Sequence, residues 1–512
     1  MVKQNPRKLT MKIKTLLTYF FALMLWNVLA EPQLVDENVF FKKSISFTPS
    51  DKQQQDQRWL RKPAKKFNFP NSQMREINGV PFILADGRKL SFFTRSVNRY
   101  VASGAPVERA MRESGVNCFM IDIYLPESLA TAPRDSFSNF KRYADKILES
   151  VPDAFLMVRF WMPNVTKDFV KNHPDALLTG PDGKKDWEAT YHSKHNFRPN
   201  FLNEWRLYFG ELLYKFIDRL GNSKYAPRTV GIYVAAMNSG EWWFYKGRGD
   251  PGWDYSKTRK EAFKHFLQAK YKGQLAELKK RWKVQSDAEL YRLPTLQERT
   301  QKNLQPCSRV SDYNQTLNLP VTNAAIYFAK IIKTLSGGRL LAGMEIHAHL
   351  NIMNCNGTVF VRQLLECPEI DFLGGPPFYA DRNLGNSAPP HFVGASFRKY
   401  HKMFFVEGDF RTHQAYGTAS GTLGEPPIDP AGSVEMLRRE FMRGMLKQYP
   451  IYLMDFGWPW FYDPLILTEI GNMECLAQFM SETGVKRNAE IALVSDQESQ
   501  LYGNYFANAT HL

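Results

Sequence analysis

Short apolar runs alternate with longer amphipathic segments from about residue 88 onwards. A short apolar run is typical of a buried strand, and a longer segment with apolar residues at spacings of three and four is typical of a helix. The runs cover residues 90–94, 118–124, 155–160, 230–236, 340–344, 370–373, 403–406 and 451–454, and the helical segments include residues 137–148, 205–220, 261–282, 324–335 and 434–447. Eight strands alternating with helices predict an α/β fold, a parallel (β/α)8 TIM barrel. A doubly wound open sheet is the alternative, although no G-x-G-x-x-G follows the first run.

Two segments flank the predicted barrel, which we place at residues 86–485. Residues 31–85 form a polar, basic extension ending in a hairpin, because Asn78-Gly79 stands between apolar residues. We expect this hairpin to close one end of the barrel. At the other flank, residues 486–512 contain a new apolar run at 489–496, which predicts a C-terminal strand and the stub of a second domain.

The first thirty residues have the pattern of a signal peptide. Five basic residues precede the apolar run 16–29, which ends in the cleavage pattern Val28-Leu29-Ala30. An uncleaved membrane anchor is the alternative, but the run is shorter than the roughly 20 residues that a membrane-spanning helix needs. We therefore expect a secreted or periplasmic protein.

The chain is basic, with 67 Lys and Arg against 51 Asp and Glu and a net charge of +16. The basic residues are dispersed and not clustered with aromatic residues, which argues against a nucleic-acid partner. An exported basic surface suits acidic glycans or anionic surfaces better. The five cysteines stand singly without a C-x-x-C pair, which argues against a zinc knuckle and against a disulfide framework and leaves one bridge open.

Two glutamates follow apolar runs at the strand ends where a parallel barrel has its active site. Glu241 comes after the fourth run, beside Trp242 and Trp243, and Glu407 comes after the seventh. Hydrolysis of a glycosidic bond needs such a pair, because one carboxyl group protonates the departing oxygen and the other attacks or stabilises the anomeric carbon. We predict that the two tryptophans desolvate Glu241, raise its pKa and make it the acid.

The second glutamate has charged neighbours in the sequence. Because Arg411 and His413 follow Glu407 closely, we expect Glu407 to stay ionised and to act as the nucleophile. Asp409 is the obvious rival for that role, and Asp455, after the eighth run, is a weaker one.

Aromatic residues after the predicted strands are candidates for sugar binding, because flat rings stack on the apolar faces of sugars. We expect about half of them to pack in the core instead. Trp458-Pro459-Trp460 is the first choice for a platform, and Trp242 and Tyr379 are further candidates. The full set is Trp161, Trp242, Trp243, Phe378, Tyr379, Trp458 and Trp460.

Arg159 closes the third run, where it would bind a substrate hydroxyl, steady the nucleophile or form a structural ion pair. Glu345, His347 and His349 follow the fifth run at alternate positions, as metal ligands could. They lack the H-E-x-x-H spacing and a nearby cysteine cluster. We therefore predict no metal and no cofactor, and we interpret the histidines as substrate-contacting or structural.

Beyond the two glutamates, two patches resemble the family 42 β-galactosidases of the clan A glycoside hydrolases. One is His195-Asn196-Phe197-Arg198-Pro199-Asn200, before the fourth run. The other is the pattern Phe263-x-x-Phe266-x-x-x-x-Tyr271, followed by Leu275, Leu278 and Trp282. The run 489–496 resembles the opening strand of the flavodoxin-like trimerisation domain that follows the barrel in that family. The likeness spans roughly residues 85 to 500.

The resemblance implies a retaining mechanism, with Glu241 as acid/base, Glu407 as nucleophile and about 5 to 5.5 Å between the carboxyl groups. It also places His195 and Asn238 at the substrate. Clan A members carry an asparagine directly before the acid/base to bind the 2-hydroxyl of the sugar, whereas Asn238 stands three residues before Glu241. The four-cysteine zinc site of some members has no counterpart, and a homo-oligomer stays open.

Two classes of function follow. The first is an exported retaining glycoside hydrolase that cleaves β-galactosidic or related oligosaccharides or polysaccharides, with sulfated or acidic substrates included because the chain is basic. The alternative is a non-catalytic glycan-binding protein on the same barrel. Glu241 and Glu407 discriminate between them, because carboxyl groups that point away from the cleft or lie more than about 10 Å apart would support neither glycosidase geometry.

Overall fold

The structure is a computed structural model, and its described residues cover most of the chain from residue 66 to residue 502. The signal-peptide pattern, residues 31–65 of the extension, the run 489–496 and the positions Asn238 and Tyr379 lie outside them. The described ranges are 66–97, 105–124, 136–162, 165, 167–185, 187–190, 193–197, 199–237, 240–242, 253–300, 304–347, 359–378, 382–387, 392–415, 427, 429–455, 458–486 and 498–502.

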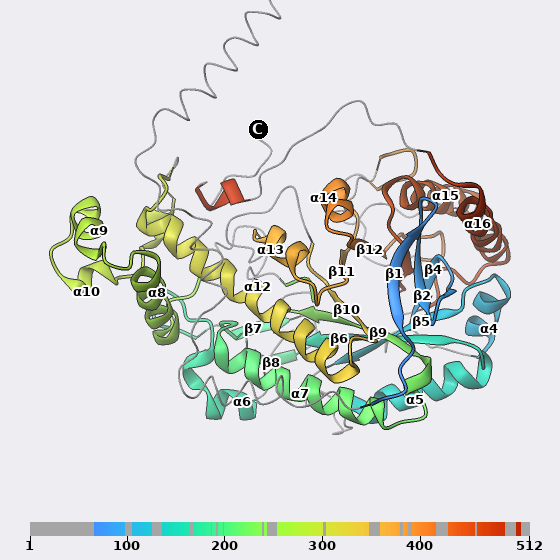
Figure 1. Cartoon of the computed structure of the whole chain (residues 1–512), viewed down its shortest axis with the longest axis horizontal. Helices are drawn as coiled ribbons and strands as arrows, with labels where there is room; N and C mark the ends of the chain where they lie inside the picture. The colour runs from blue at the N-terminus through green and yellow to red at the C-terminus, as the bar shows by residue number, and fades with distance from the viewer. Residues whose placement is uncertain are drawn as a thin grey trace, which may run out of the picture. The chain divides into compact units, whose positions relative to one another are not determined.

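Eight parallel strands close into a barrel, as the pattern of apolar runs predicts, and every predicted run overlaps one of them. Each strand pairs with its neighbours in sequence order, and β13 pairs with β4 to complete the circle. The fold is therefore the predicted (β/α)8 barrel and not an open doubly wound sheet (Figure 1). The strands are β4 (Phe93–Val97), β5 (Cys118–Tyr124), β6 (Phe155–Met162), β9 (Thr229–Ala236), β10 (Leu341–Met344), β11 (Phe372–Gly375), β12 (Met403–Gly408) and β13 (Ile451–Leu453).

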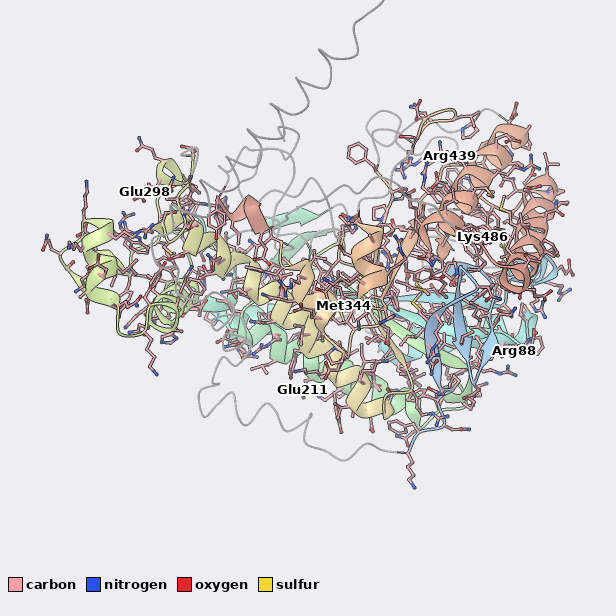
Figure 2. All side chains as sticks on the ribbon, turned by 45° about the horizontal axis from the view of Figure 1, so that its top comes forward. Arg88, Glu211, Glu298, Met344, Arg439 and Lys486 are labelled. Atoms are coloured by element: carbon pink, nitrogen blue, oxygen red, sulfur yellow. The ribbon has the colours of Figure 1, made fainter. Side chains whose placement is uncertain are left out.

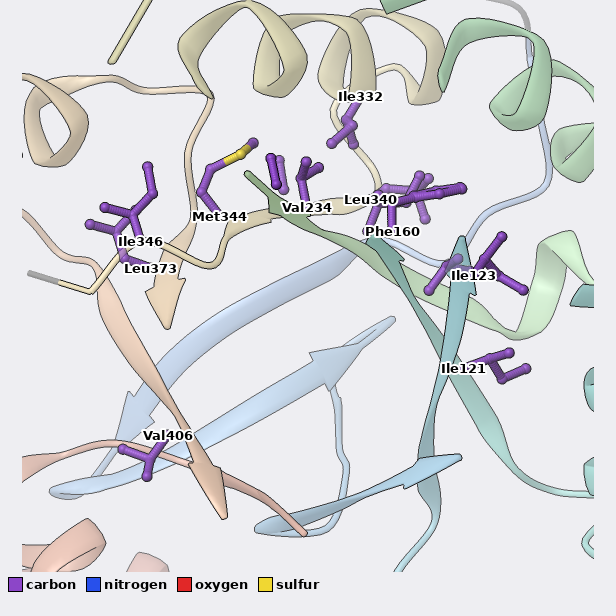
Figure 3. Close-up of a cluster of buried hydrophobic side chains, with 14 of the residues drawn as sticks. Ile121, Ile123, Phe160, Val234, Ile332, Leu340, Met344, Ile346, Leu373 and Val406 are labelled. Atoms are coloured by element: carbon purple, nitrogen blue, oxygen red, sulfur yellow. The ribbon is translucent and has the colours of Figure 1, made fainter. Parts of the chain in front are cut away.

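The strands are apolar on both faces because the barrel is filled inside and covered by helices outside. Met120, Met157 and Phe405 belong to the inner cluster. The outward side chains meet the surrounding helices, as Val234 of β9 and Ile332 of α12 do in Figure 3. Burial on both faces explains why the strands are continuous apolar runs and do not alternate with polar residues.

A hairpin covers the end of the barrel where the strands begin, as expected. It consists of β1 (Ser72–Ile77) and β2 (Val80–Ala85), with β3 (Arg88–Lys89) as a third short strand. Asn78 and Gly79 form the two-residue turn with φ of 50° and 92°, which these residue types tolerate. Ile83 and Ala85 of β2 belong to the inner cluster, so the hairpin supplies the apolar floor of the barrel.

The helices confirm most of the predicted segments and correct one. The predicted helix at 261–282 is two helices, because the chain turns at Gly273, where φ is 79°. The helices α4, α6, α10, α11, α13, α14 and α16 lie outside the helical segments named from the sequence. The helices are α4 (Ala105–Glu113), α5 (Ser136–Ser150), α6 (Lys167–Asn172), α7 (Asn203–Gly221), α8 (Lys257–Lys270), α9 (Leu275–Trp282), α10 (Asp287–Leu290), α11 (Leu296–Arg299), α12 (Arg309–Ser336), α13 (Val361–Glu366), α14 (Gly394–Lys399), α15 (Pro430–Lys447) and α16 (Pro464–Thr483), with 3-10 turns η2 (Pro174–Ala176), η3 (Ala226–Arg228) and η5 (Glu498–Tyr502). None of the described helices is long and apolar enough to cross a membrane.

Helices α8 to α11 form a lobe with its own small core, which packs against the N-terminal half of α12. Phe263, Tyr271 and Leu278, which carry part of the family resemblance, are buried in this core together with Tyr313 and Leu317 of α12. Figure 1 shows α8, α9 and α10 beside the start of α12, and Figure 2 shows Glu298 in the lobe and Met344 in the barrel. The patch that resembles the family therefore builds the lobe and not the mouth of the barrel.

An antiparallel pair, β7 (Trp187–Thr190) and β8 (Ser193–Phe197), lies between β6 and β9 in the chain. Asn200, just after β8, donates from its side chain to Thr258 at 2.6 Å, and Arg259 of α8 donates to the carbonyl of Asn200 at 2.9 Å. These bonds join the end of the first patch of resemblance to the start of α8, the helix on which the second patch begins. The cysteines within the described residues, Cys118, Cys307, Cys367 and Cys475, are free.

Candidate active site

A tight turn after β9 returns Glu241 to the rim of the barrel. The Trp242 N–H donates to the carbonyl of Ala236 at 2.7 Å, and the Ala236 N–H donates to the carbonyl of Gly240 at 2.9 Å. Gly240 has a φ of 81°, and a Cβ there would lie 2.7 Å from the ring of Trp161, so the turn requires glycine. The turn holds Glu241 at the mouth with 8% of its surface exposed.

Glu407 projects from the end of β12, beside Tyr452 of the neighbouring strand β13. It is 4% exposed, and its Oε2 accepts a hydrogen bond from the Tyr452 hydroxyl at 2.5 Å. The same oxygen lies 3.1 Å from a guanidinium nitrogen of Arg159. Two donors therefore fix the carboxyl group of Glu407 at the mouth of the barrel.

The guanidinium of Arg159 contacts three carboxyl groups and is itself fully buried. Its Nε donates to Glu345 at 2.7 Å, and one NH2 group donates both to the other oxygen of Glu345 and to Glu407. Asp122 lies 3.5 Å from the remaining nitrogen. Arg159 therefore forms the structural ion pair that we considered and also contacts the expected nucleophile.

The pKa of Glu241 is raised, as the sequence predicts, and the pKa of Glu407 is also raised, which was not expected. Burial, and then the negative charge of Glu407, raise the pKa of Glu241 well above its usual value. Burial also raises the pKa of Glu407, but the positive charge of Arg159 opposes this rise. Glu241 is therefore the carboxyl group better suited to hold a proton near neutral pH, and each carboxyl group lies within the electrostatic reach of the other.

Arg411 and His413, which we expected beside Glu407, lie near other carboxyl groups. The Nε of Arg411 lies 4.0 Å from Asp409, and the Nε2 of His413 lies 3.7 Å from Asp463. Arg159, 248 positions away in the sequence, supplies the cation beside Glu407. Proximity along the chain misled the prediction, because consecutive residues at a strand end turn to different sides.

Both rival nucleophiles are engaged by arginines. Asp409 lies 3.5 Å from an NH2 group of Arg382 and accepts another bond from it at its carbonyl, in addition to the Arg411 contact. Asp455 forms a buried ion pair with Arg95 of β4. Burial raises the pKa of Asp455 to about 6, against the opposing charge of that arginine.

The tryptophans divide between the core and the surface. Trp242 and Trp460 are fully buried, and Trp242 packs against the rings of Trp205 and Phe328. Neither ring has a face free for a sugar, so Trp242 and Trp460 do not have the positions expected of substrate platforms. Trp458 is 40% exposed, and its indole N–H donates to the carbonyl of Gln414.

Trp161, which follows Arg159 by two residues, lies half-buried at the mouth. Its Nε1 donates to Asp122 at 3.2 Å, and the guanidinium of Arg159 lies 4.3 Å from its ring centre. Of the other candidates, His195 lies on β8, with its side chain outside the described part of the chain. Asn238, Trp243, Tyr379 and His349 are also outside it.

Sequence reasoning missed the parts that Asp122 and Tyr452 play, and it gave no definite role to Glu345 and His347. Asp122 is the lone carboxylate within the apolar run 118–124, which is the signal that could have found it. His347 is fully buried, and its Nε2 lies 3.6 Å from Glu241. Both oxygens of Glu345 accept from Arg159, so Glu345 has the contacts of an ion-pair partner.

Comparison with known proteins agrees with this architecture. No protein-family model and no curated protein sequence matches the chain. Among solved structures, the β-galactosidase of the psychrophilic Marinomonas ef1 is similar, with a TM-score of 0.52 and 13% identity over 76% of this chain and 60% of that one. The β-galactosidase of the haloarchaeon Halorubrum lacusprofundi has a TM-score of 0.51 and 13% identity over 75% and 58%.

A catalytic mutant of Gan42B, a GH42 β-galactosidase from G. stearothermophilus, has a TM-score of 0.52 and 11% identity over 82% of this chain and 61% of that one. The shared feature is the barrel fold. The chain spans about three fifths of the length of these enzymes. At such low identity the likeness establishes the fold, and the chemistry has to be argued from the side chains of this chain.

Proposed function

We propose that the protein is an exported retaining glycoside hydrolase, with Glu241 as acid/base and Glu407 as nucleophile. Its substrates would be β-galactosidic or related oligosaccharides, with sulfated or acidic ones included because the chain carries a net charge of +16. One observation carries this proposal: two nearly buried carboxyl groups lie at the ends of the fourth and seventh strands of a closed barrel, in different electrostatic environments. The β-galactosidases that share the fold make a β-galactoside the first substrate to test.

In the first step, a carboxylate oxygen of Glu407 forms a bond to the anomeric carbon while the bond from that carbon to the departing oxygen breaks. The proton of Glu241 passes to the departing oxygen. Burial supports this role for Glu241, because it favours the protonated form. Arg159 and the Tyr452 hydroxyl, both bonded to Glu407, favour its ionised form and aim its oxygen.

In the second step, the ionised Glu241 takes a proton from a water molecule. The oxygen of that water bonds to the anomeric carbon as the ester bond to Glu407 breaks, which restores both carboxyl groups. The product keeps the anomeric configuration of the substrate. Retention therefore depends on a covalent intermediate at Glu407.

The decisive experiment traps that intermediate. An activated 2-deoxy-2-fluoro-β-galactoside should inactivate the enzyme and add the mass of one sugar to the peptide that contains Glu407. Glu407→Gln should lose at least about 1,000-fold in kcat, because the covalent route is removed. Wild-type turnover by Glu407→Gln, or a label on Asp409, would overturn the assignment of the nucleophile.

A second experiment separates the two glutamates. Glu241→Gly should be rescued by azide on a substrate with a good leaving group and should yield a glycosyl azide of retained configuration. Glu407→Gly with azide should yield the inverted product, because azide then attacks from the side of the missing nucleophile. A wild-type protein that binds glycans and cleaves none across a panel of neutral and sulfated galactosides would instead support the non-catalytic alternative.

Export is a separate part of the proposal and rests on the sequence of residues 1–30. Expression in a secreting host should release a protein whose N-terminal sequence begins at Glu31. A full-length protein retained in the cytoplasm would contradict export and leave the chemistry unaffected.

A further inference from the structure

Two residues just after β10 lie close to the proposed catalytic glutamates. His347 lies beside Glu241, and Glu345 is linked to Glu407 through Arg159. We infer that His347 is a positioning residue for Glu241 and that Glu345, acting through Arg159, is a positioning residue for Glu407. This inference rests on the proposed function, because it assigns the two residues to the same double displacement. The strand end between the acid/base and the nucleophile would then control both.

The alternation of side chains along β10 explains why both residues reach the active site. Met344 and Ile346 pack outward with Leu373 in the cluster between barrel and helices (Figure 3). Residues at alternate positions point the opposite way, so Glu345 and His347 turn toward the inside of the barrel mouth. Both are fully buried.

Glu345 fixes the plane of the Arg159 guanidinium. Two nitrogens of Arg159 donate to the two oxygens of Glu345, a forked arrangement that defines both position and orientation. In that orientation an NH2 group of Arg159 lies 3.1 Å from Glu407. A neutral or shorter partner at 345 would leave the guanidinium free to turn toward Asp122, 3.5 Å from its other nitrogen.

The ring of His347 packs against Gly375 of β11, where the absence of a side chain leaves room for it. A Cβ at Gly375 would lie 2.1 Å from Cδ2 and 2.5 Å from Nε2 of His347, so the imidazole occupies the space that any other residue would fill. Packed in this way, Nε2 faces Glu241 at 3.6 Å. At this distance, longer than a hydrogen bond, an N–H on Nε2 stabilises through its electrostatic attraction the ionised Glu241 that must activate water in the second step.

The charged groups around each glutamate set the expected pH effects. The charges of Glu407, Arg159 and Asp409 act on Glu241, and the Nε2 of His347 lies 3.6 Å from its carboxyl group. In His347→Phe, the ionised form of Glu241 loses the electrostatic stabilisation of the nearby imidazole, so the pKa of Glu241 rises and the alkaline limb of kcat/KM moves to higher pH. The phenyl ring keeps the packing against Gly375.

The pKa of Glu407 depends on the charges of Arg159 and Asp409 and on its interactions with the Tyr452 hydroxyl and Glu345. In Glu345→Gln the guanidinium of Arg159 is no longer held at Glu407, and Glu407 also loses its interaction with the Glu345 carboxyl group. Both of these interactions lower the pKa of Glu407, so without them its pKa rises and the acid limb of kcat/KM moves to higher pH. Because Arg159 loses its fixed orientation, we expect kcat to fall about 10- to 100-fold, with KM within about twofold of wild type.

Matched controls come from the same molecule. Asp455→Asn breaks another buried carboxylate–arginine pair at the rim, and His413→Phe removes a histidine 3.7 Å from a carboxylate that is neither glutamate. In both controls the acid and alkaline limbs of the kcat/KM profile should stay at the wild-type pH, even where stability falls. A shift of the limbs in the controls equal to that in His347→Phe and Glu345→Gln would overturn the inference.

A second readout keeps this test independent of the proposed function. In protein labelled with carbon-13 at the glutamate carboxyl carbon, NMR titration follows Glu241 and Glu407 directly, with Glu241→Gln and Glu407→Gln assigning the signals. We expect His347→Phe to shift the midpoint of Glu241 upward and Glu345→Gln to shift the midpoint of Glu407 upward, whether or not a substrate is cleaved. Unchanged midpoints would refute the positioning roles, whereas shifted midpoints without turnover of any glycoside would refute only the proposed function.

Discussion

Where the strands begin, the inside of the barrel is apolar, and where they end, it is filled with ionisable groups. At the first end, Ile83 of the hairpin packs with Leu90 and Phe155 of the chain around it. At the other end, Arg159 joins Asp122, Glu345 and Glu407, all with little or no exposure to solvent. The same closed sheet therefore has an apolar floor and a charged mouth.

This difference separates stability from function. Burial of apolar side chains contributes to the stability of the fold, roughly 25 cal/mol for each Å² removed from water. Burial of carboxyl groups opposes folding, and it raises the pKa values of Asp122, Glu241 and Glu345. A fold tolerates such a cluster where the shifted groups carry out chemistry, so the mouth is the part of the barrel expected to act on substrate.

The largest effect is expected when the cation at the mouth, Arg159, is removed. Arg159→Met leaves three buried carboxyl groups without their shared partner, and we expect unfolding free energy to fall by about 3 to 5 kcal/mol. Activity should fall at least about 100-fold even in the folded fraction, because Glu407 loses a donor. Chemical denaturation and active-site titration would measure the two effects separately.

The matched control is Arg95→Met, which breaks the buried pair with Asp455. It should lose a comparable amount of stability while the folded fraction keeps its turnover. Equal losses of turnover in both variants would mean that the network around Arg159 serves only to hold the barrel together.

A buried carboxyl group near the start of β4 gives a further test of the difference between the two ends of the barrel. Glu474 of α16 accepts hydrogen bonds from the backbone of Phe92 and Phe93, at the start of β4, and burial raises its pKa to about 8. Between pH 4.5 and about 8 the unfolded chain releases this proton and the folded chain retains it. Stability should therefore be fully present below pH 4.5 and fall as pH rises, by at most about 1.4 kcal/mol per pH unit, until it levels off above pH 8.

Glu474→Gln should remove this part of the pH dependence, as denaturation at several pH values would show. The pH profile of kcat/KM should stay the same, because the carboxyl group of Glu474 accepts its hydrogen bonds from Phe92 and Phe93 at the start of β4 and not from the mouth of the barrel. A changed activity profile would contradict the separation of floor and mouth.

The sequence was informative where a contact is local or an element is repeated. All eight strands followed from apolar runs, and the hairpin followed from Asn78-Gly79. The raised pKa of Glu241 was also predicted, and burial is its largest cause. Helix α16 was missed even though Asp463 caps it and Pro464 begins it, both recognisable start signals.

The contacts that assemble the mouth could not be predicted, because they join residues far apart in the chain. Arg159 and Glu345 are 186 positions apart, and their meeting depends on the closed barrel. The tryptophans show the same limit. Trp242 has a positive φ of 60° and packs inward, whereas Trp458 stays 40% exposed, and the residues around them do not reveal which outcome to expect.

Trp458 gives the smallest effect and the finest test of what belongs to the mouth. Trp458→Ala should weaken substrate binding about 3- to 10-fold, which is about 1 kcal/mol, because an exposed ring with its N–H bonded to Gln414 is held ready for stacking. Stability should change by less than about 0.5 kcal/mol, since the side chain is largely outside the core. Titration calorimetry with a substrate bound to Glu407→Gln would measure the binding term. Phe479→Ala, which removes a ring 59% exposed on α16, is the control and should leave binding unchanged. If Trp458→Ala unfolds the protein or leaves binding intact, the ring is part of the scaffold and the substrate lies elsewhere along the rim.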